Sequence, residues 1–336
     1  MSKVIFELVQ GGCGIHRMLY PARFMAAEPE FSGRVFCTRE PFVEPGDSLV
    51  MHGITAPADL VAIGNVLKKG GKFIWSIDDD YTSIPDWNPA KLHDEDMWMP
   101  NILSRLADFI VVSTEHLASK IDFKYRDKVR VCKNMMDVML YNLTDSPSPL
   151  DDSGRIRFLW SGSLTHRKDV EILDPVIDYL FEKYTNKFTI DFLGGPPSDR
   201  ISTRYLGMGV RSHPGVNVVE YDRVVSKLRP HVVFAPLYEC EFNRSKSAIR
   251  VYDGWCLSAA VIASRFGEYC CIRHDEDGLL CSTVEDWIAA VDSVMQDFSN
   301  LARIASNGRR RVEAEFNWRV VGLRKDWRNL LREILN

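Results

Sequence analysis

Four turns in the sequence carry glycines, cations or carboxylates at positions where a ligand could bind. Each follows a short apolar run of the kind that forms a buried strand, and in parallel sheets ligands bind beyond the carboxyl ends of the strands. The first turn is Gln10-Gly-Gly-Cys-Gly-Ile-His-Arg17. Its glycines let the backbone approach a phosphate closely, and the following helix start offers N–H groups. A plain tight turn explains Gly11 and Gly12 equally well.

The second turn has the sequence Trp160-Ser-Gly-Ser-Leu-Thr-His-Arg-Lys-Asp169. A phosphate bound here could accept backbone N–H groups and take charge from Arg167 or Lys168. The alternative is a helix that Thr165 caps, with both cations in solvent.

The third turn runs from Glu239 to Asp253 and contains Asn-Arg-Ser-Lys-Ser. Ser245 is the expected N-cap of a helix, which puts Lys246 in its first turn, where a cation opposes the helix dipole. Asp253 follows at i+7 on roughly the same face. Because this arrangement is unfavourable without a bound anion, it favours a functional site over surface decoration.

The fourth turn, Ser76-Ile-Asp-Asp-Asp-Tyr81, places three carboxylates in succession after a buried strand. Like charges this close repel one another unless sugar hydroxyls, a cation or arginines receive them. Asp78 and Asp80 also read as an Asp-x-Asp metal motif. The other interpretation is an acidic turn that caps a helix.

The elements that position these turns alternate between short apolar runs and amphipathic stretches, a pattern typical of βαβ units. In the first half we expect strands at 4–8, 34–38, 48–52, 72–77, 109–113 and 128–132, with helices at 15–27, 57–68, 94–107 and 114–121. In the second half we expect strands at 156–161, 188–193, 216–221, 231–236 and 260–264, with helices at 169–183, 245–256, 284–296 and 301–315.

A polar, proline-bearing stretch at 142–154 separates the two halves and has the composition of a linker. We therefore expect Rossmann-like domains at 1–150 and 151–316. The amphipathic segment 317–336 is expected to return to the first domain as a helix.

Composition sets further limits on the function. The 336 residues are 46% hydrophobic and 26% charged, with a net charge of −4, so the chain has no overall attraction to nucleic acid or anionic lipid. It contains no apolar run of about 18 residues and no signal-peptide pattern, which predicts a cytoplasmic protein without a membrane anchor. The eight cysteines lack metal-binding spacing and are expected to be reduced and mostly buried.

Taken together, these motifs resemble retaining GT-B glycosyltransferases, especially the family-4 type of bacterial and phage enzymes. The matching motifs are Asp78-Asp79-Asp80 with Ile84-Pro85 and Asn88-Pro89, Ser113-Thr-Glu-His-Leu117, Gly162-Ser-Leu-Thr-His166 with Asp169, and Asn243-Arg-Ser-Lys-Ser247 running into Val261-Ile-Ala-Ser264. The resemblance implies two doubly wound domains that face each other across a cleft. The first would receive the acceptor and the second a UDP- or GDP-linked sugar.

The resemblance also implies residue roles, with no metal and no cofactor other than the nucleotide sugar. Catalysis falls to Asp78, Asp79 and Lys246, and donor binding to Gly11, Gly12, Ser163, His166, Arg167, Lys168, Tyr221, Glu241, Asn243, Arg244, Ser245 and Asp253. Asp253 would bind the ribose, and the segment that ends at Tyr221 would lie near the base.

Two departures from the family pattern stand out. Many members carry two glutamates eight positions apart, where this chain has Ser245 and Asp253. Glu239 or Glu241 are possible substitutes for the first. The strand that often ends in His-Asp ends here in Asp78-Asp79, so the histidine expected near the reacting centre is missing.

The implied reaction is a same-face displacement with retention, in which fixed cations stabilise the leaving diphosphate in place of a metal. Three rival functions remain open at this stage: a metal-dependent single-sheet glycosyltransferase, a GT-B sugar-nucleotide epimerase and a non-catalytic sugar-nucleotide-binding module. The acceptor could be a glycan, a lipid-linked sugar or a hydroxymethylated base of phage DNA. Cations that could contact DNA are Arg105, Lys120, Lys124, Arg126, Lys128 and Arg130, although a solvated basic face is the favoured interpretation.

Overall fold

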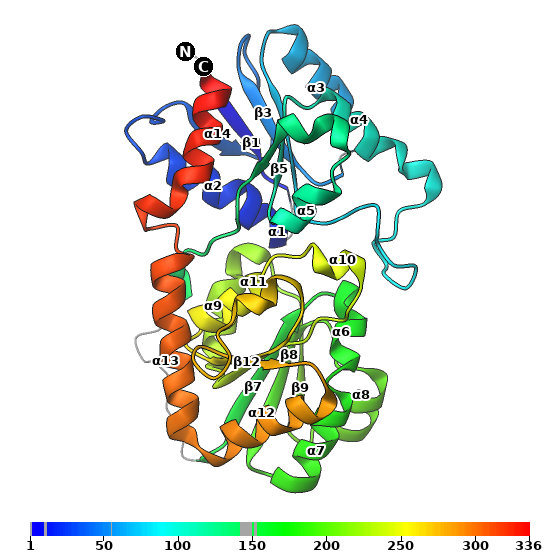
Figure 1. Cartoon of the computed structure of the whole chain (residues 1–336), viewed down its shortest axis with the longest axis vertical. Coiled ribbons are helices and arrows are strands. Elements are labelled where there is room, and N and C mark those ends of the chain that lie inside the picture. Colours follow the sequence, from blue (N-terminus) through cyan, green and yellow to red (C-terminus); the bar gives the residue numbers. More distant parts are fainter. Residues whose placement is uncertain (1, 10–11, 55, 142–149, 151–152) are drawn as a thin grey trace.

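The computed structural model describes residues 2–9, 12–54, 56–141, 150 and 153–336, which form two parallel sheets stacked along the long axis of the molecule (Figure 1). The first sheet has six strands in the order β2-β1-β3-β4-β5-β6. Their bounds are β1 Val4–Glu7, β2 Val35–Thr38, β3 Ser48–His52, β4 Phe73–Ile77, β5 Phe109–Val112 and β6 Val129–Val131. Their apolar, mostly buried sequences suit a parallel sheet that is covered on both faces.

Helices on both faces of this sheet complete the first domain. They are α1 Gly12–Gly14, a π-helical turn Ile15–Leu19, α2 Tyr20–Ala26, α3 Asp59–Lys68, α4 Trp98–Leu106 and α5 Glu115–Lys120. Thr114 caps α5 by accepting the backbone N–H of Leu117 at 3.1 Å. The start of α5 therefore lies directly beyond the carboxyl end of β5.

The second sheet also has six parallel strands, in the order β12-β11-β10-β7-β8-β9. The strands are β7 Ile156–Gly162, β8 Phe188–Gly194, β9 Val210–Pro214, β10 Val232–Ala235, β11 Ala260–Ser264 and β12 Leu279–Cys281. The helices are α6 Arg167–Glu171, α7 Asp174–Tyr184, α8 Asp199–Tyr205, α9 Tyr221–Leu228, α10 Glu241–Arg244, α11 Ile249–Cys256, α12 Val284–Gln296 and α13 Phe298–Glu315. The predicted pair of Rossmann-like domains is confirmed.

Two expectations about the second domain are wrong. Residues 216–221 are not a strand, because the strand beside β8 is β9, and the chain then forms a short 3-10 turn before α9. Tyr221, Val224, Val225 and Leu228 recur at helical spacing and pack on the core, so the chain from Tyr221 onward forms a helix. The predicted helix 245–256 begins only at Ile249.

The chain crosses between the domains twice, and the two crossings lie side by side. Met136 receives a backbone hydrogen bond from Trp318 at 2.9 Å and donates one to Phe316 at 2.8 Å. The buried carboxylate of Asp137 accepts two hydrogen bonds from Arg319, at 2.7 and 3.1 Å. These contacts tie both crossings into one hinge.

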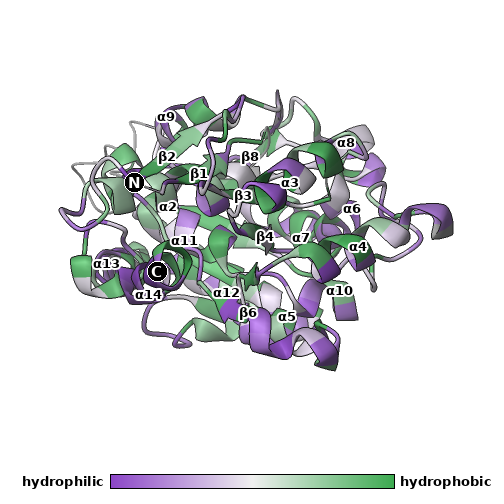
Figure 2. Cartoon of the chain, turned by 90° about the horizontal axis from the view of Figure 1, so that it is seen from above, coloured by the Kyte–Doolittle hydropathy of each residue, from purple (hydrophilic) through white to green (hydrophobic). Residues whose placement is uncertain are grey.

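The last helix, α14 Lys325–Leu335, packs on the first domain against β1, β6 and α2 (Figure 1). Trp318, Trp327, Leu330 and Leu331 are buried in the same core as Val4 and Phe6. Figure 2 shows hydrophilic residues on the outward faces of α5 and α14, with hydrophobic strands between the helices. Among the described residues, no helix combines the length and apolar character that crossing a bilayer requires.

Candidate functional site

A pocket of about 610 Å³ lies between the two domains, at the carboxyl ends of both sheets. The first domain contributes Cys13, His16, Asp78 and Asp79 to its lining. The second domain contributes most of the remaining wall, including Ser161, Gly162, Ser163, His166, Tyr221, Lys246, Arg250 and Asp253. The structure thus brings together Asp78, Asp79, Lys246, Ser163, His166, Tyr221 and Asp253 among the predicted site residues.

Other predicted residues stand outside the pocket lining. Arg167 and Lys168 point outward from α6, where they pair with Asp199 at 2.8 Å and Glu171 at 2.7 Å. They are therefore not placed to neutralise a phosphate in the pocket. Gly12 starts α1, and Gly11 is outside the described residues.

The residues of α10 support the pocket from behind or from its rim. Glu241 is half exposed and pairs with His116 and Lys120 of the first domain, so it is not free to replace a sugar-binding glutamate. Arg244 covers the ring of Phe266 at 4.6 Å. Ser245 is buried at the end of α10, where its carbonyl accepts the Thr114 hydroxyl at 3.0 Å, and it does not cap α11.

Lys246 lies in the turn between α10 and α11 and reaches across the cleft. Its ammonium group is 2.7 Å from the Asp79 carboxylate and 4.3 Å from the centre of the Phe242 ring. Burial opposes the charged form, but Asp79 outweighs it and raises the pKa of Lys246. The lysine is thus a charged group, held in place, with 18% of its side chain exposed.

Arg250 is a second cation in the pocket that our sequence interpretation missed. Its guanidinium lies over the Trp160 ring at 5.3 Å, and its buried Nη1 has no hydrogen-bond partner among the described residues. A Cβ at position 162 would come within 2.8 Å of this nitrogen, so a glycine at this position leaves space beside the guanidinium. The feature of the sequence that could have revealed Arg250 is its position, four residues after Lys246 in the same segment.

Asp169, in α6, connects the turn after β7 to α10. Its carboxylate is within 2.6 Å of Nδ1 of His166 and accepts hydrogen bonds from the Tyr238 backbone at 2.7 Å and the Asn243 amide at 3.0 Å. Burial and the nearby Arg250 lower the pKa of His166 to about 4. We therefore assign a neutral ring whose Nδ1–H donates to Asp169. Asn243 acts behind the pocket wall as a support.

Asp253 is buried at the other end of the pocket, against two tyrosines. The Tyr141 hydroxyl donates to its carboxylate, and the Tyr221 hydroxyl is 2.7 Å from Ser161 Oγ. Burial is the main cause that raises the pKa of Asp253 to about 6. This carboxyl can accept hydroxyl groups of a ligand above that pH.

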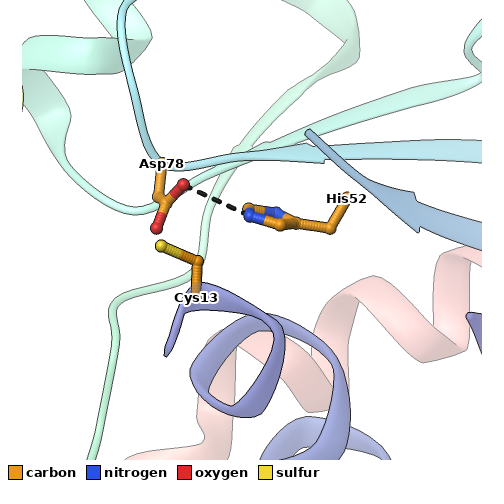
Figure 3. A group of neighbouring side chains, drawn as sticks. All are labelled: Cys13, His52 and Asp78. Carbon is orange, nitrogen blue, oxygen red and sulfur yellow. Dashed lines mark ion pairs between the residues drawn. The ribbon is translucent and has the colours of Figure 1, made fainter. Parts of the chain in front are cut away.

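Asp78 is held on the first-domain side by two side chains from distant segments (Figure 3). The His52 Nε2 atom at the end of β3 is 3.3 Å from the carboxylate, and the Cys13 thiol of α1 donates to it. Burial opposes ionisation, but the histidine and the thiol outweigh it and lower the pKa of Asp78. A histidine from the neighbouring strand β3 thus lies beside Asp78.

Asp80 does not join the other two aspartates at the pocket. It accepts hydrogen bonds from the Thr82 and Ser83 hydroxyls, both at 2.6 Å, and from the Thr82 backbone at 3.0 Å. Both oxygens of Asp80 are thus engaged within its own turn, whereas Asp78 and Asp79 line the pocket.

The fully buried Arg17 stabilises the floor of this region. It donates to the Ser76 hydroxyl at 3.1 Å, to the Val111 carbonyl at 3.2 Å and to the Asn134 side chain at 3.2 Å. Asn134 in turn donates to Ser247 of the second domain at 2.9 Å. Arg17 therefore links the first sheet to the domain interface.

An exposed aromatic pair bridges the domains at the rim of the pocket. Trp87 and Tyr238 are 36% and 43% exposed, and their ring centres lie 6.2 Å apart in an edge-to-face arrangement. The adjacent Asn88 donates to the carbonyl of Thr165, which lines the pocket, at 3.4 Å. The rim therefore offers flat apolar surface beside the cavity.

The cysteines differ from the expectation, because only Cys132, Cys256 and Cys281 of the eight are buried. All are free thiols. The glycine-rich turn and the strand ends place some of them at surfaces or near the cleft instead of in the cores.

Protein-family models and curated protein sequences gave no match to this chain. Solved structures did. HepE from Anabaena, in complex with UDP and glucose, aligns over 99% of this chain and 100% of its own, with 14% identity and a TM-score of 0.67. A glycosyltransferase from Rickettsia africae aligns over 100% and 99%, with 12% identity and a TM-score of 0.66.

TarM from S. aureus is also similar, with 12% identity and a TM-score of 0.62 over 86% of this chain. The chain spans about half of TarM, since 55% of that protein is covered. At such identities the shared property is the architecture. Two parallel six-stranded sheets with a pocket between them, and these structural neighbours, show that this chain has the GT-B fold of glycosyltransferases.

Proposed function

We propose that this chain transfers a sugar from a UDP-sugar to a hydroxyl acceptor with retention of the anomeric configuration, and that the leaving group needs no metal. The best support is the opposition of two half-buried cations, Lys246 and Arg250, to Asp78 and Asp79 in one interdomain pocket. Structures of the neighbour HepE contain UDP, UDP with glucose, or UDP-glucose, which favours a uridine donor over a guanosine donor.

The donor diphosphate is bound by the Gly162 turn and the two cations. The unpaired Nη1 of Arg250 lies beside Gly162, so a phosphate oxygen there completes its hydrogen bonding. Lys246 stabilises the negative charge that grows on the phosphate as the sugar leaves. Asp253 accepts ribose hydroxyls at the other end of the pocket.

The two aspartates have different roles in this proposal. Asp79 positions Lys246 through their 2.7 Å contact. Asp78 orients the acceptor hydroxyl, because its carboxylate is ionised and fixed by His52 and Cys13.

In the reaction the bond from the anomeric carbon to the phosphate oxygen breaks, and a bond to the acceptor oxygen forms on the same face. The acceptor proton passes to the departing phosphate oxygen, and UDP is released. Lys246 and Arg250 contribute most in the transition state, where the phosphate charge is greatest.

A carbohydrate acceptor is favoured over a DNA base. Trp87 and Tyr238 give the rim flat apolar surface of the kind that packs against a sugar ring. Three of the six candidate DNA contacts pair with carboxylates: Lys120 with Glu241, Lys124 with Asp122 and Arg130 with Glu333. A polyanion would have to compete with these carboxylates.

The test is a panel of UDP- and GDP-sugars, first for thermal stabilisation and then for turnover with and without EDTA. A UDP-sugar should stabilise the protein, and in the presence of carbohydrate acceptors it should yield UDP and an α-linked product if the donor is α-linked. Activity that EDTA abolishes would contradict the metal-free leaving group. Epimerisation of the donor's sugar without release of free UDP would indicate an epimerase. Binding of the donor without any turnover would indicate a binding module.

A further inference from the structure

We propose that Cys13, His52 and Asp78 form a zinc-binding site beneath the acceptor side of the pocket. Cys13 Sγ, a ring nitrogen of His52 and a carboxylate oxygen of Asp78 all lie within 4.8 Å of one another. The three side chains come from the start of the first helix, the end of β3 and the residue after β4, and they point toward a common centre (Figure 3). A thiol, an imidazole and a carboxylate are ligand types that zinc uses in proteins.

The spacing of these atoms fits a tetrahedral ion. Nitrogen and oxygen ligands bind zinc at about 2.0–2.2 Å, so two of them at a tetrahedral angle are about 3.3–3.6 Å apart. Nε2 of His52 and Oδ1 of Asp78 are 3.3 Å apart. The ion can therefore enter between them with little movement of either side chain. Three protein ligands leave a fourth position for water or a substrate hydroxyl, as in open zinc sites.

Binding requires a neutral His52 ring and deprotonation of the Cys13 thiol. The buried Nδ1 of His52 has no hydrogen-bond partner among the described residues, so it can carry the ring proton while Nε2 binds the metal. Zinc binding converts the Cys13 thiol to a thiolate, and the proton leaves to solvent. The thiolate and the Asp78 carboxylate then neutralise the two charges of the ion, which limits repulsion from the neighbouring Arg17 and Lys246.

Zinc at this site regulates the transfer reaction, and this part of the inference rests on the proposed function. Asp78 is the group that orients the acceptor hydroxyl, and a metal bound to its carboxylate removes it from that role. The cations on the donor side are untouched, since Lys246 contacts Asp79 and Arg250 contacts Trp160. Zinc is therefore expected to inhibit sugar transfer while UDP binding persists.

The test is titration of the metal-free, reduced full-length protein with Co²⁺ and Zn²⁺. Cobalt bound to a thiolate gives a charge-transfer absorption in the near ultraviolet, which zinc then displaces. We expect one equivalent in the wild-type protein and in Cys270→Ser, which removes the exposed cysteine as a control. Cys13→Ser should abolish the band. It should weaken zinc binding at least about tenfold, because even an outer-shell partner contributes about 10- to 100-fold.

A second variant, His52→Asn, keeps the thiol and should weaken cobalt binding while retaining a thiolate band at high metal concentration. No band in the wild-type protein, or a band that survives Cys13→Ser, would overturn the zinc site. The proposed sugar transfer would be unaffected by that result, because UDP-sugar turnover is measured separately. One bound zinc in a protein that transfers no sugar would instead overturn the proposed function and leave the metal site intact.

Discussion

The two walls of the cleft differ in the charge they present to the pocket. The second domain contributes Lys246 and Arg250 beside a turn whose glycine leaves room for a ligand. The first domain contributes Asp78 and Asp79, and its buried cation, Arg17, supports the floor. One wall is therefore suited to hold an anion and the other to hold and orient a neutral hydroxyl. The contrast teaches that duplicated architecture can acquire opposite electrostatic roles through a few residues at the strand ends.

The largest effect should come from removing the cation that crosses the cleft. Lys246→Ala is expected to lower kcat by about 10²- to 10³-fold, because the variant loses charge stabilisation of the transition state. Steady-state turnover with the best UDP-sugar measures this. Lys227→Ala, on the exposed face of α9, is the matched control. Unchanged turnover in Lys246→Ala, with the melting temperature preserved, would refute the role of Lys246.

The second cation should act mainly on binding. Arg250→Ala is expected to weaken UDP affinity by about 10- to 100-fold, since one or two charge-assisted hydrogen bonds to phosphate are lost. Calorimetric titration with UDP measures this loss, and Arg223→Ala at an exposed position serves as the control. Affinity for uridine should hardly change, because it has no phosphate. An equal loss for uridine and UDP would point to a structural role.

The opposite wall should respond in the opposite manner. Asp78→Asn is expected to reduce transfer to the acceptor by about tenfold, the contribution of one hydrogen bond to a charged group, while UDP affinity stays the same. Parallel measurements of kcat and of the UDP dissociation constant separate the two walls. If UDP affinity fell as much as turnover, the division of labour between the domains would be wrong.

The smallest effect should be a pH dependence at the ribose end. The pKa of Asp253 is raised to about 6, so its carboxyl is ionised above this pH and becomes protonated as the pH falls through it. A protonated carboxyl is the weaker acceptor, and UDP affinity is expected to fall by about three- to tenfold between pH 7 and pH 5. Asp253→Asn should bind more weakly at pH 7, with a flatter profile. An identical profile in both proteins would assign the titration to the nucleotide.

Much of the fold could be predicted because each buried parallel strand is an apolar run bounded by turn residues. β3 and β11 begin and end at the predicted residues, and α12 also agrees at both ends. The segment 216–221 could not be predicted, because Val-Asn-Val-Val is compatible with a strand until its packing partners are known. In the structure Val218–Glu220 form a 3-10 turn and Tyr221 begins α9, whose Tyr221 and Val225 pack on the core.

The pocket-lining residues that could be predicted lie in turns that single segments of the sequence reveal. Lys246 and Asp253 lie in one short stretch, and both line the pocket. The arrangement of Asp78 with Cys13 and His52 depends on one helix start and two strand ends that lie far apart in the sequence, and no spacing along the chain encodes it. Arg167 and Lys168 lie outside the pocket lining, since their position in a turn does not determine the direction in which α6 points them.

The C-terminal helix has a consequence for the order in which the domains mature. Trp318, Trp327 and Leu330 complete the core that begins with Val4 and Phe6, yet they are synthesised after the whole second domain. On the ribosome, the second domain can therefore assemble its own core while the first still lacks part of its interior. We infer that the chain folds against its direction of synthesis, with the first domain finished last, whereas domains generally mature from the N-terminus onward.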